Sequence, residues 1–353
     1  MSFQQHLEQH LSNISKDTTF NVYNLNSNLS KCSSPLIKRS SDDTYLRHRL
    51  ILLSTPSIGF ICGLETYEYT ISSKEGKIKQ HVIYISKVDT TITDEATTKG
   101  VTGKLILAYL ESLPPQSSVF VFARAKPQYL FAHSATNTGK TVLGDRDLVS
   151  WWLHLLNKVS IDSTGWWFVP GIEDEPSALI ESGARKRNWK SAQHIQWKYG
   201  TSYPPDAQAA DVIPQFEDDA KSRFLKDNLE DDMSVSNFWE VLAFSEECGS
   251  GKITGFFELR LNCSEAETGS IKEEESTDDF TKFWNKLMEL DFHDKESILA
   301  STQTAIQEIE SIFDSSFRFQ IKVEPKEQTK QMENSKRAAV NILSAGLIKR
   351  KKV

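Results

Sequence analysis

The feature that most constrains the fold is a strand, a long loop and a helix in direct succession between residues 119 and 152. Residues 119–122 are Val-Phe-Val-Phe, a β-branched and aromatic run that predicts a buried strand. An amphipathic helix is expected at the other end, with one stripe formed by Leu148, Trp151, Trp152, Leu155 and Leu156. The loop of about twenty residues between them carries Arg124, Lys126, Tyr129, Phe131, His133 and Lys140. Loops of this length are usually functional or disordered, and the mixture of aromatics and cations indicates a ligand with an apolar part and an anionic part.

The same loop contains a near match to a phosphate-binding P-loop. Residues 134–141 have the sequence Ser-Ala-Thr-Asn-Thr-Gly-Lys-Thr, whereas a P-loop begins with Gly, which lets the backbone bend around the phosphate. A P-loop also follows its strand directly, but ten residues separate Arg124 from Ala135. Nucleotide binding through this segment is therefore the less favoured interpretation.

Length and composition allow a sizeable core. The 353 residues are 39% hydrophobic and include eight Trp, enough for one large domain or two ordinary ones. No run of about 18 apolar residues occurs, so no membrane span is expected, and residues 1–17 lack a signal-peptide pattern. The cysteines have no zinc-like spacing, so we expect no metal and reduced thiols in an intracellular protein; they are Cys32, Cys62, Cys248 and Cys263.

Charge is distributed unevenly along the chain. Residues 322–353 hold nine Lys and Arg against three Glu, a net +6, so the total of −7 leaves −13 on residues 1–321. An acidic body attracts basic partners and repels nucleic acid, so direct sequence-specific nucleic-acid binding is not expected. The basic cluster at residues 349–352 is typical of a nuclear-entry signal.

Helix and strand signals alternate through the middle of the chain. A short helix is expected over residues 3–14, followed by a polar, Ser- and Asn-rich loop over residues 15–45. The next signals predict strands at 49–54, 60–72 and 81–86, the last two as an antiparallel hairpin with Asp89 just past its end. Further helices are expected at 104–113, 148–156, 176–186, 216–224, 238–244, 279–291 and 294–313, and further strands at 119–124, 166–169, 195–199 and 253–261.

This order of elements favours an α/β fold, a single mixed central sheet surrounded by helices. Residues 317–323 alternate and predict a strand or a frayed helix end. We expect residues 1–323 to form one domain that contains an acidic loop at about 264–279. Residues 324–353 are expected to form a disordered basic tail.

Four sequence blocks resemble a known family and occur in that family's order. They are S-K-x-D-T at 86–90, F-x-R-x-x-x-Q-Y-L-F at 122–131, L-x-x-x-x-L-x-x-W-W ending at Trp152, and I-P-x-F-x-D-D-x-K-x-R-F at 213–224. These blocks resemble the fungal histone H3 acetyltransferases of the regulator-of-Ty-transposition family, over about residues 45–250. The resemblance implies the acetyl-CoA-dependent fold of the metazoan CREB-binding-protein acetyltransferases.

The resemblance also implies an activity, a place and partners. The chain would be an acyltransferase that moves acetyl from acetyl-CoA to lysines of histone H3, in the αN helix of the histone core and in the tail. Histone chaperones of the anti-silencing-function and nucleosome-assembly-protein types would present H3–H4 in the nucleus, during replication-coupled nucleosome assembly that supports genome stability. Two alternatives remain, a catalytically inactive histone- or chaperone-binding module and an NTP-binding protein.

Residues expected to hold acetyl-CoA follow from matching the blocks. Arg124 is a planar, permanently charged donor suited to pyrophosphate, and Lys140 offers a further point charge. Phe122 and Trp151 would lie along the cofactor, although plain core packing is their alternative role. The full expected set is Val88, Asp89, Thr90, Thr97, Thr98, Lys99, Gly100, Phe122, Arg124, Lys126, Thr141, Val142, Leu143 and Trp151.

The acceptor lysine must lose a proton before it attacks the thioester. A free lysine has a pKa near 10.4, so the neutral amine costs about 4 kcal/mol at cellular pH, and an apolar tunnel with a carboxylate lowers that cost. The resemblance gives Asp219 as the base or positioning group and Tyr129 and Trp152 as tunnel walls. The alternatives are a helix cap for Asp219, a loop anchor for Tyr129 and core packing for Trp152.

The resemblance extends to substrate contacts and to modification of the chain itself. Asp89, Trp152 and Asp218 would contact the histone, and Lys221 would become acetylated, which removes the cost of burying an ammonium. The alternative for Lys221 is an exposed helix lysine paired with an acid. The chain departs from the family where only five residues separate Leu113 from Val119, in place of a long lysine-rich insertion.

Overall fold

One mixed β-sheet organises the part of the chain that the structure describes. The computed structural model describes residues 1–14, 17–93, 97–217, 220–228, 233–246, 248–249, 251–262, 271, 278–313 and 315–324. Within these ranges ten strands form one sheet, in the order β10-β1-β3-β4-β5-β6-β9-β7-β8, with β2 beside β3. Only the β5–β6 and β7–β8 pairs are parallel. The predicted single mixed sheet with helices around it is confirmed.

The strand and helix bounds are as follows. The strands are β1 (Thr18–Asn26), β2 (Ser30–Lys31), β3 (Asp43–Thr55), β4 (Gly59–Ser72), β5 (Ile78–Thr90), β6 (Ser118–Ala123), β7 (Ser163–Phe168), β8 (Ile195–Tyr199), β9 (Gly255–Leu261) and β10 (Arg318–Val323). The α-helices are α1 (Phe3–Leu11), α2 (Val101–Glu111), α3 (Asp145–Leu156), α4 (Glu175–Glu181), α5 (Ala209–Val212), α6 (Ala220–Asn228), α7 (Val235–Ala243), α8 (Asp279–Glu289) and α9 (Lys295–Ile312). Two short 3-10 turns are η1 (Ser134–Thr136) and η2 (Ser315–Phe317).

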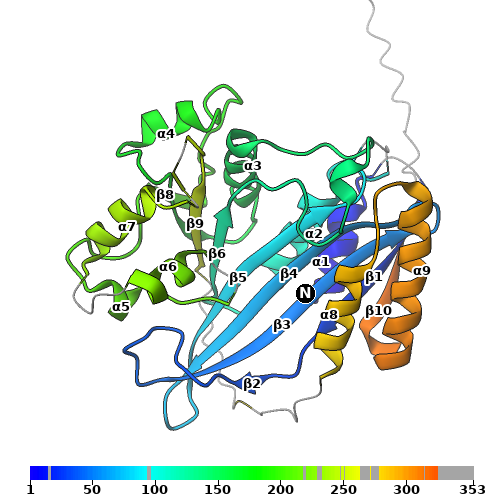
Figure 1. Cartoon of the computed structure of the whole chain (residues 1–353), viewed down its shortest axis with the longest axis horizontal. Helices are drawn as coiled ribbons and strands as arrows, with labels where there is room; N and C mark the ends of the chain where they lie inside the picture. Colours follow the sequence, from blue (N-terminus) through cyan, green and yellow to red (C-terminus); the bar gives the residue numbers. More distant parts are fainter. Residues whose placement is uncertain are drawn as a thin grey trace, which may run out of the picture.

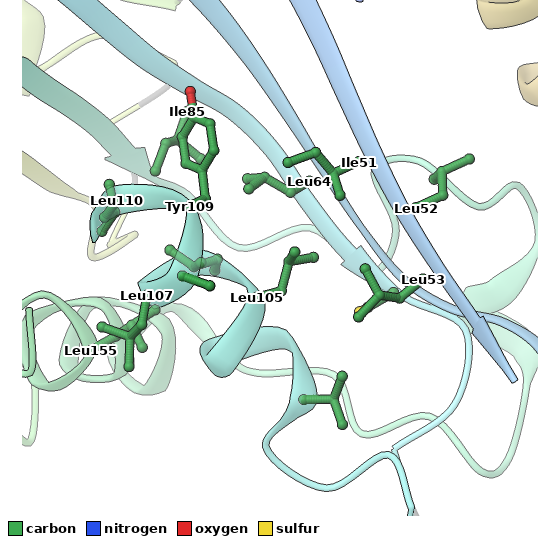
Figure 2. Close-up of a cluster of buried hydrophobic side chains, with 14 of the residues drawn as sticks. Ile51, Leu52, Leu53, Leu64, Ile85, Leu105, Leu107, Tyr109, Leu110 and Leu155 are labelled. Carbon is green, nitrogen blue, oxygen red and sulfur yellow. The ribbon is translucent and has the colours of Figure 1, made fainter. Parts of the chain in front are cut away.

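Helices cover both faces of the long strands (Figure 1). Successive residues of a strand point to opposite faces, and β3 shows both layers in two neighbouring residues. The ring of His48 lies 4.5 Å from the ring of Phe280 in α8. The guanidinium of Arg49, the next residue, lies 5.2 Å from the ring of Tyr109 in α2. Figure 2 shows the α2 side of this core, with Leu105 directed toward the strands.

The helix α3 extends that core toward β6 and β9. In Figure 2, Leu155 of α3 lies beside Leu107 of α2, and both side chains are buried. Helices α4 to α7 gather around the β9–β7–β8 end of the sheet (Figure 1). There Phe238 of α7 is fully buried in a second apolar cluster with Phe256 of β9. Alternate residues of β6 thus pack in different clusters, since Val121 and Ala123 belong to the main core while Phe122 packs against the second cluster.

The prediction of a loop over residues 15–45 is wrong for the first half of that range. Residues 18–26 form β1, which pairs with β10 on one side and β3 on the other. The buried Phe20 and Val22 follow the period of a strand, but two intervening Asn residues made the segment look polar. Asn21 is accommodated because its side-chain oxygen accepts a hydrogen bond from the Gln320 amide at 2.7 Å.

Two other boundaries correct the sequence analysis. Asp89 does not follow the hairpin strand but lies within β5, where it pairs with Gly63 of β4. Residues 317–323 form β10 for the most part, so the strand alternative holds. The expected tail beyond residue 324, with its basic cluster at 349–352, lies outside the described residues, as does most of the expected acidic loop at 264–279. The division into a domain and a tail therefore stays a prediction.

Candidate active site

A pocket of about 310 Å³ opens where β5 and β6 separate. The parallel pairing of these strands ends at Ile85 and Val121. Beyond those residues the two chains continue along opposite sides of the pocket, and the start of α2, the loop after β6 and one face of α3 complete its wall. A ligand in this pocket would therefore contact five separate segments of the chain.

Most of the predicted cofactor residues line this pocket. Thr97 does not line it, and Asp218 and Asp219 lie outside the described residues. The predicted residues that do line it are Val88, Asp89, Thr90, Thr98, Lys99, Gly100, Phe122, Arg124, Lys126, Tyr129, Lys140, Thr141, Val142, Leu143, Trp151 and Trp152. Ile85 and Val121 also line the pocket and were not predicted, because the register that brings them together is a tertiary feature.

The first turn of α2 forms the end of the pocket best suited to an anion. Gly100 caps this helix in a left-handed conformation, with φ of +75°, and no side chain occupies the cap. The first backbone N–H groups of a helix lack partners within the helix and favour negative charge. Lys99 beside it is exposed, and the pocket wall also includes the half-buried Arg124 and the exposed Lys126.

The pocket wall also contains aromatic side chains. Trp152 is 4% exposed, and its ring lies 5.0 Å from that of Trp151. Phe122 stacks on Phe256 with ring centroids 4.5 Å apart and also lines the pocket. Core packing and pocket lining, which the sequence analysis treated as alternatives for this residue, therefore occur together.

Tyr129 shapes the loop that follows β6. Its hydroxyl accepts a hydrogen bond from the backbone N–H of Lys126 at 2.8 Å and donates one to the carbonyl of Arg124. Burial raises the pKa of Tyr129 to about 12, so the hydroxyl stays protonated near neutral pH. Tyr129 is thus a loop anchor, and it also presents its side chain to the pocket.

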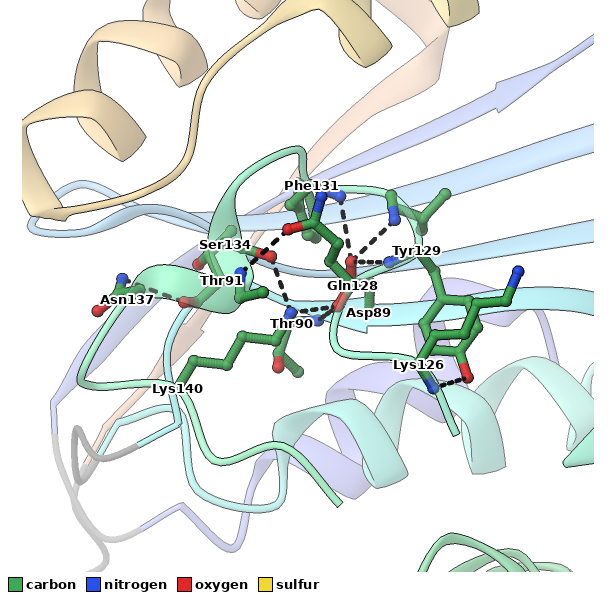
Figure 3. A network of polar contacts seen from close by, with 12 residues as sticks. Asp89, Thr90, Thr91, Lys126, Gln128, Tyr129, Phe131, Ser134, Asn137 and Lys140 are labelled. Atoms are coloured by element: carbon green, nitrogen blue, oxygen red, sulfur yellow. Dashed lines mark hydrogen bonds and ion pairs between the residues drawn. The ribbon is translucent and has the colours of Figure 1, made fainter. Parts of the chain in front are cut away.

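Asp89 holds the same loop through its carboxylate (Figure 3). One oxygen accepts hydrogen bonds from the backbone N–H groups of Tyr129, Leu130 and Phe131, at 2.7, 2.8 and 3.1 Å. The other oxygen accepts from the N–H of Thr90 at 2.8 Å and from the Lys140 ammonium at 2.7 Å. Only 5% of Asp89 is exposed, which favours a structural role over the expected contact with a histone.

Lys140 does not point a free charge at the pocket. Its ammonium is bonded to Asp89 and donates to the Ser134 hydroxyl at 2.8 Å, and the side chain is 4% exposed. The expected point charge for the cofactor phosphates is therefore used inside the loop. Residues 134–141 also lack the strand–loop–helix arrangement of a P-loop, because they form the η1 turn and then an irregular segment.

A smaller apolar pocket adjoins the first and shares Val121 and Phe122 with it. Lys221 of α6 lies in its wall and is 5% exposed, so the exposed-lysine alternative is wrong. The ammonium donates to the Pro214 carbonyl at 2.5 Å and lies 4.7 Å from the centre of the Phe216 ring. Glu258 lines the same pocket, and burial raises the pKa of its carboxyl.

Among the residues with described positions, no set of three or more His, Cys, Asp and Glu side chains is arranged to hold a metal ion. Within the same ranges, no helix combines the length and apolarity needed to cross a membrane.

Comparison with known proteins places the chain in a family of acyltransferases. The family model of the histone acetyltransferase KAT11-type domain matches residues 7–116 and 113–309. The chain therefore belongs to the KAT11-type histone acetyltransferases. The crystal structure of Rtt109 from Aspergillus fumigatus has a similar fold, with a TM-score of 0.72 and 21% sequence identity over 90% of this chain and 99% of that one.

Two curated relatives carry the same name. The histone acetyltransferase rtt109 of Schizosaccharomyces pombe is 30% identical over 274 residues, which are 68% of this chain and 67% of that protein. The histone acetyltransferase RTT109 of Candida albicans is 27% identical over 188 residues, 50% of this chain and 48% of that protein. The chain thus aligns with about two thirds of the first relative and about half of the second.

Proposed function

We propose that the chain transfers acetyl from acetyl-CoA to lysine side chains of histone H3, with acetyl-CoA in the pocket between β5 and β6. The observation that carries the proposal is the composition of the pocket wall, which combines the cations Lys99, Arg124 and Lys126 with aromatic side chains such as those of Phe122, Trp151 and Trp152. Acetyl-CoA has the same division, a charged nucleotide joined to an apolar thioester arm. The names of the relatives, histone acetyltransferases, support the same activity.

The cofactor would lie with its phosphates at the mouth. Arg124 and Lys126 would contact the pyrophosphate together with the backbone N–H groups at the start of α2. The pantetheine arm would run past Val88 and Phe122 toward Trp152, where water is largely excluded by the buried ring. A site with little water strengthens the polarisation of a thioester carbonyl.

In the transfer itself, the neutral lysine nitrogen attacks the thioester carbonyl carbon. A C–N bond forms, the C–S bond breaks, and the proton lost by the amine balances the departing CoA thiolate. Tyr129 is unsuited to take that proton, because its pKa of about 12 and its bond to the Arg124 carbonyl keep it protonated. We propose Asp219, directly before α6, as the base or positioning group, with Asp218 and Trp152 in contact with the histone.

Partners and location are part of the proposal. An acidic body suits a basic histone, and H3–H4 would be presented by a chaperone of the anti-silencing-function or nucleosome-assembly-protein type. Acetylation of histone H3 would take place in the nucleus, during nucleosome assembly linked to replication. Lys221 would be acetylated by the chain itself, since acetylation removes the charge of a buried ammonium that is held by a carbonyl and a ring.

Incubation with labelled acetyl-CoA and an H3–H4–chaperone complex tests this function. Mapping of the labelled lysines by mass spectrometry should find acetyl on H3, and Asp219→Asn should reduce the label strongly. Histone binding without any label would support the inactive module instead. Intact mass of the purified protein, compared with Lys221→Arg, should show one acetyl group that the variant lacks; its absence from an active preparation would contradict autoacetylation.

A further inference from the structure

We propose that Lys140 is a positioning residue, whose buried ammonium locks the two halves of the loop after β6 around the acetyl-CoA pocket. This inference rests on the proposed function for its effect on the cofactor. The lock itself is defined by three side chains, Asp89 of β5, Ser134 of η1 and Lys140 (Figure 3). Each is buried, and each belongs to a different segment of the chain.

This lock and the end of β5 both link the two halves of the loop. The first half, around Tyr129, is bound by Asp89 through three consecutive backbone N–H groups. The second half begins after Lys140 as Thr141, Val142 and Leu143, all of which line the pocket. Asp89 binds the first half with one oxygen and Lys140 with the other, so the pair fixes the distance between two pocket walls.

Neighbouring contacts fasten residues 137–141 to the residues that directly follow β5. The N–H of Thr93 donates to the Gly139 carbonyl at 2.8 Å, and the N–H of Thr141 donates to the Thr93 hydroxyl at 2.7 Å. The Asn137 side chain donates to the Thr91 carbonyl at 3.2 Å. Lys140 therefore lies within a short segment, residues 137–141, whose backbone runs beside residues 91–93. Loss of the Lys140 ammonium should loosen that segment first.

We expect the chain to fold without this lysine. Without it, the Asp89 carboxylate still accepts hydrogen bonds from four backbone N–H groups, and burial of the ammonium carries a cost that lowers the pKa of Lys140. A methionine has nearly the same length and fills the same space without charge. Lys140→Met should therefore fold, while the wall at residues 141–143 loses its link to Asp89 and Ser134.

An acetyl donor that lacks the nucleotide distinguishes a positioning role of Lys140 from direct contact between Lys140 and the cofactor phosphates. A lysine that touches the phosphates affects acetyl-CoA but not S-acetylpantetheine, which has no nucleotide. A lysine that positions the wall affects both, because Val142 and Leu143 would border either donor. We expect Lys140→Met to raise KM about tenfold for both donors with kcat changed less than about twofold. An increase confined to acetyl-CoA, or none for either donor, would overturn the proposal.

Hydrogen exchange of the protein without cofactor tests the lock independently of activity. Lys140→Met should speed exchange of the Thr141 amide at least tenfold, whereas Lys158→Met, at an exposed lysine after α3, should leave it unchanged. Ser134→Ala should have a smaller effect in the same direction and serves if the methionine variant fails to fold. If neither Lys140→Met nor Ser134→Ala changed the exchange rate of the Thr141 amide, the lock would be refuted. If wild-type protein transferred no acetyl while Lys140→Met still accelerated exchange, the proposed function would fail and the lock would stand.

Discussion

Around the pocket, buried polar side chains bind the backbone of the loop that forms its wall. Asp89 and Tyr129 together bind seven groups of residues 90 and 124–140. Where such a group is buried, a missing partner costs more than an average hydrogen bond contributes. The stability of variants with single substitutions at Asp89 or Tyr129 therefore measures how strongly these side chains hold the loop.

Asp89→Asn should lower the free energy of unfolding by about 3 kcal/mol or more. An amide has one acceptor oxygen where the carboxylate has two, so either three N–H groups or Lys140 loses its acceptor, and Lys140 is left without a countercharge. Denaturant unfolding measures the change. Asp42→Asn is the matched control, because Asp42 pairs with Lys79 at 2.6 Å at the surface, and it should shift the midpoint little. Equal shifts in the two variants would refute this account of Asp89.

Tyr129→Phe should change how stability depends on alkaline pH. The pKa of Tyr129 is raised by burial from 10.0 to about 12, so the neutral hydroxyl favours the folded state. Its stabilisation is complete below pH 10, the unfolded value, and is lost as the pH rises toward 12. The difference in unfolding free energy between wild type and variant should therefore shrink from pH 10 to pH 12. A constant difference across this range would show that the hydroxyl is not buried as described.

At the scale of elements, the pocket exists because β5 extends beyond the residues that pair with β6. The pairing stops at Ile85, while β5 continues to Thr90 beside β4. The gap is closed by α2, whose first turn begins at a left-handed glycine. A residue with a side chain is strained at such a φ. The space around Gly100 is open, because a Cβ added there would meet no neighbouring atom within 4 Å. A substitution at Gly100 therefore perturbs the turn through backbone strain alone, without a steric clash.

Gly100→Ala should lower stability by about 1 kcal/mol and raise KM for acetyl-CoA, because the backbone N–H groups of the α2 turn would move. Gly76→Ala is the matched control. Gly76 has φ of +80° and equally open surroundings, but lies in the turn between β4 and β5, away from the pocket. The control should show the same stability loss with unchanged KM. A KM effect in both variants, or in neither, would contradict an anion site at α2.

Sequence patterns identified some of these elements and missed others for physical reasons. The strand at β6 and the stripe of α3 were predictable, since burial imposes a strict period on apolar residues. β1 was missed because Asn21 and Asn24 lowered its apparent β propensity, although partners such as Gln320 satisfy them in the sheet. Lys140 was expected at the phosphates, because sequence gives the charge but not the carboxylate that it meets.

For the whole molecule, the sheet brings together segments that are distant in sequence. β1 pairs with β10, so the two ends of the described chain close one side of the sheet, and β9 enters between β6 and β7. No local pattern encodes these pairings. The resemblance supplied the site residues as a set, and the sheet shows why residues 88–90, 98–100, 122–126 and 141–143 form one pocket.

The most direct test of the account is a crystal structure of the protein with acetyl-CoA. Density for the cofactor is expected between β5 and β6, with the pyrophosphate within hydrogen-bond distance of Arg124 and the acetyl group beside Trp152. The Lys140 ammonium should remain bonded to Asp89 and Ser134 and should not contact a phosphate. Density in any other position, such as the pocket beside Lys221 and Trp239, would contradict the assignment of this pocket as the seat of the cofactor.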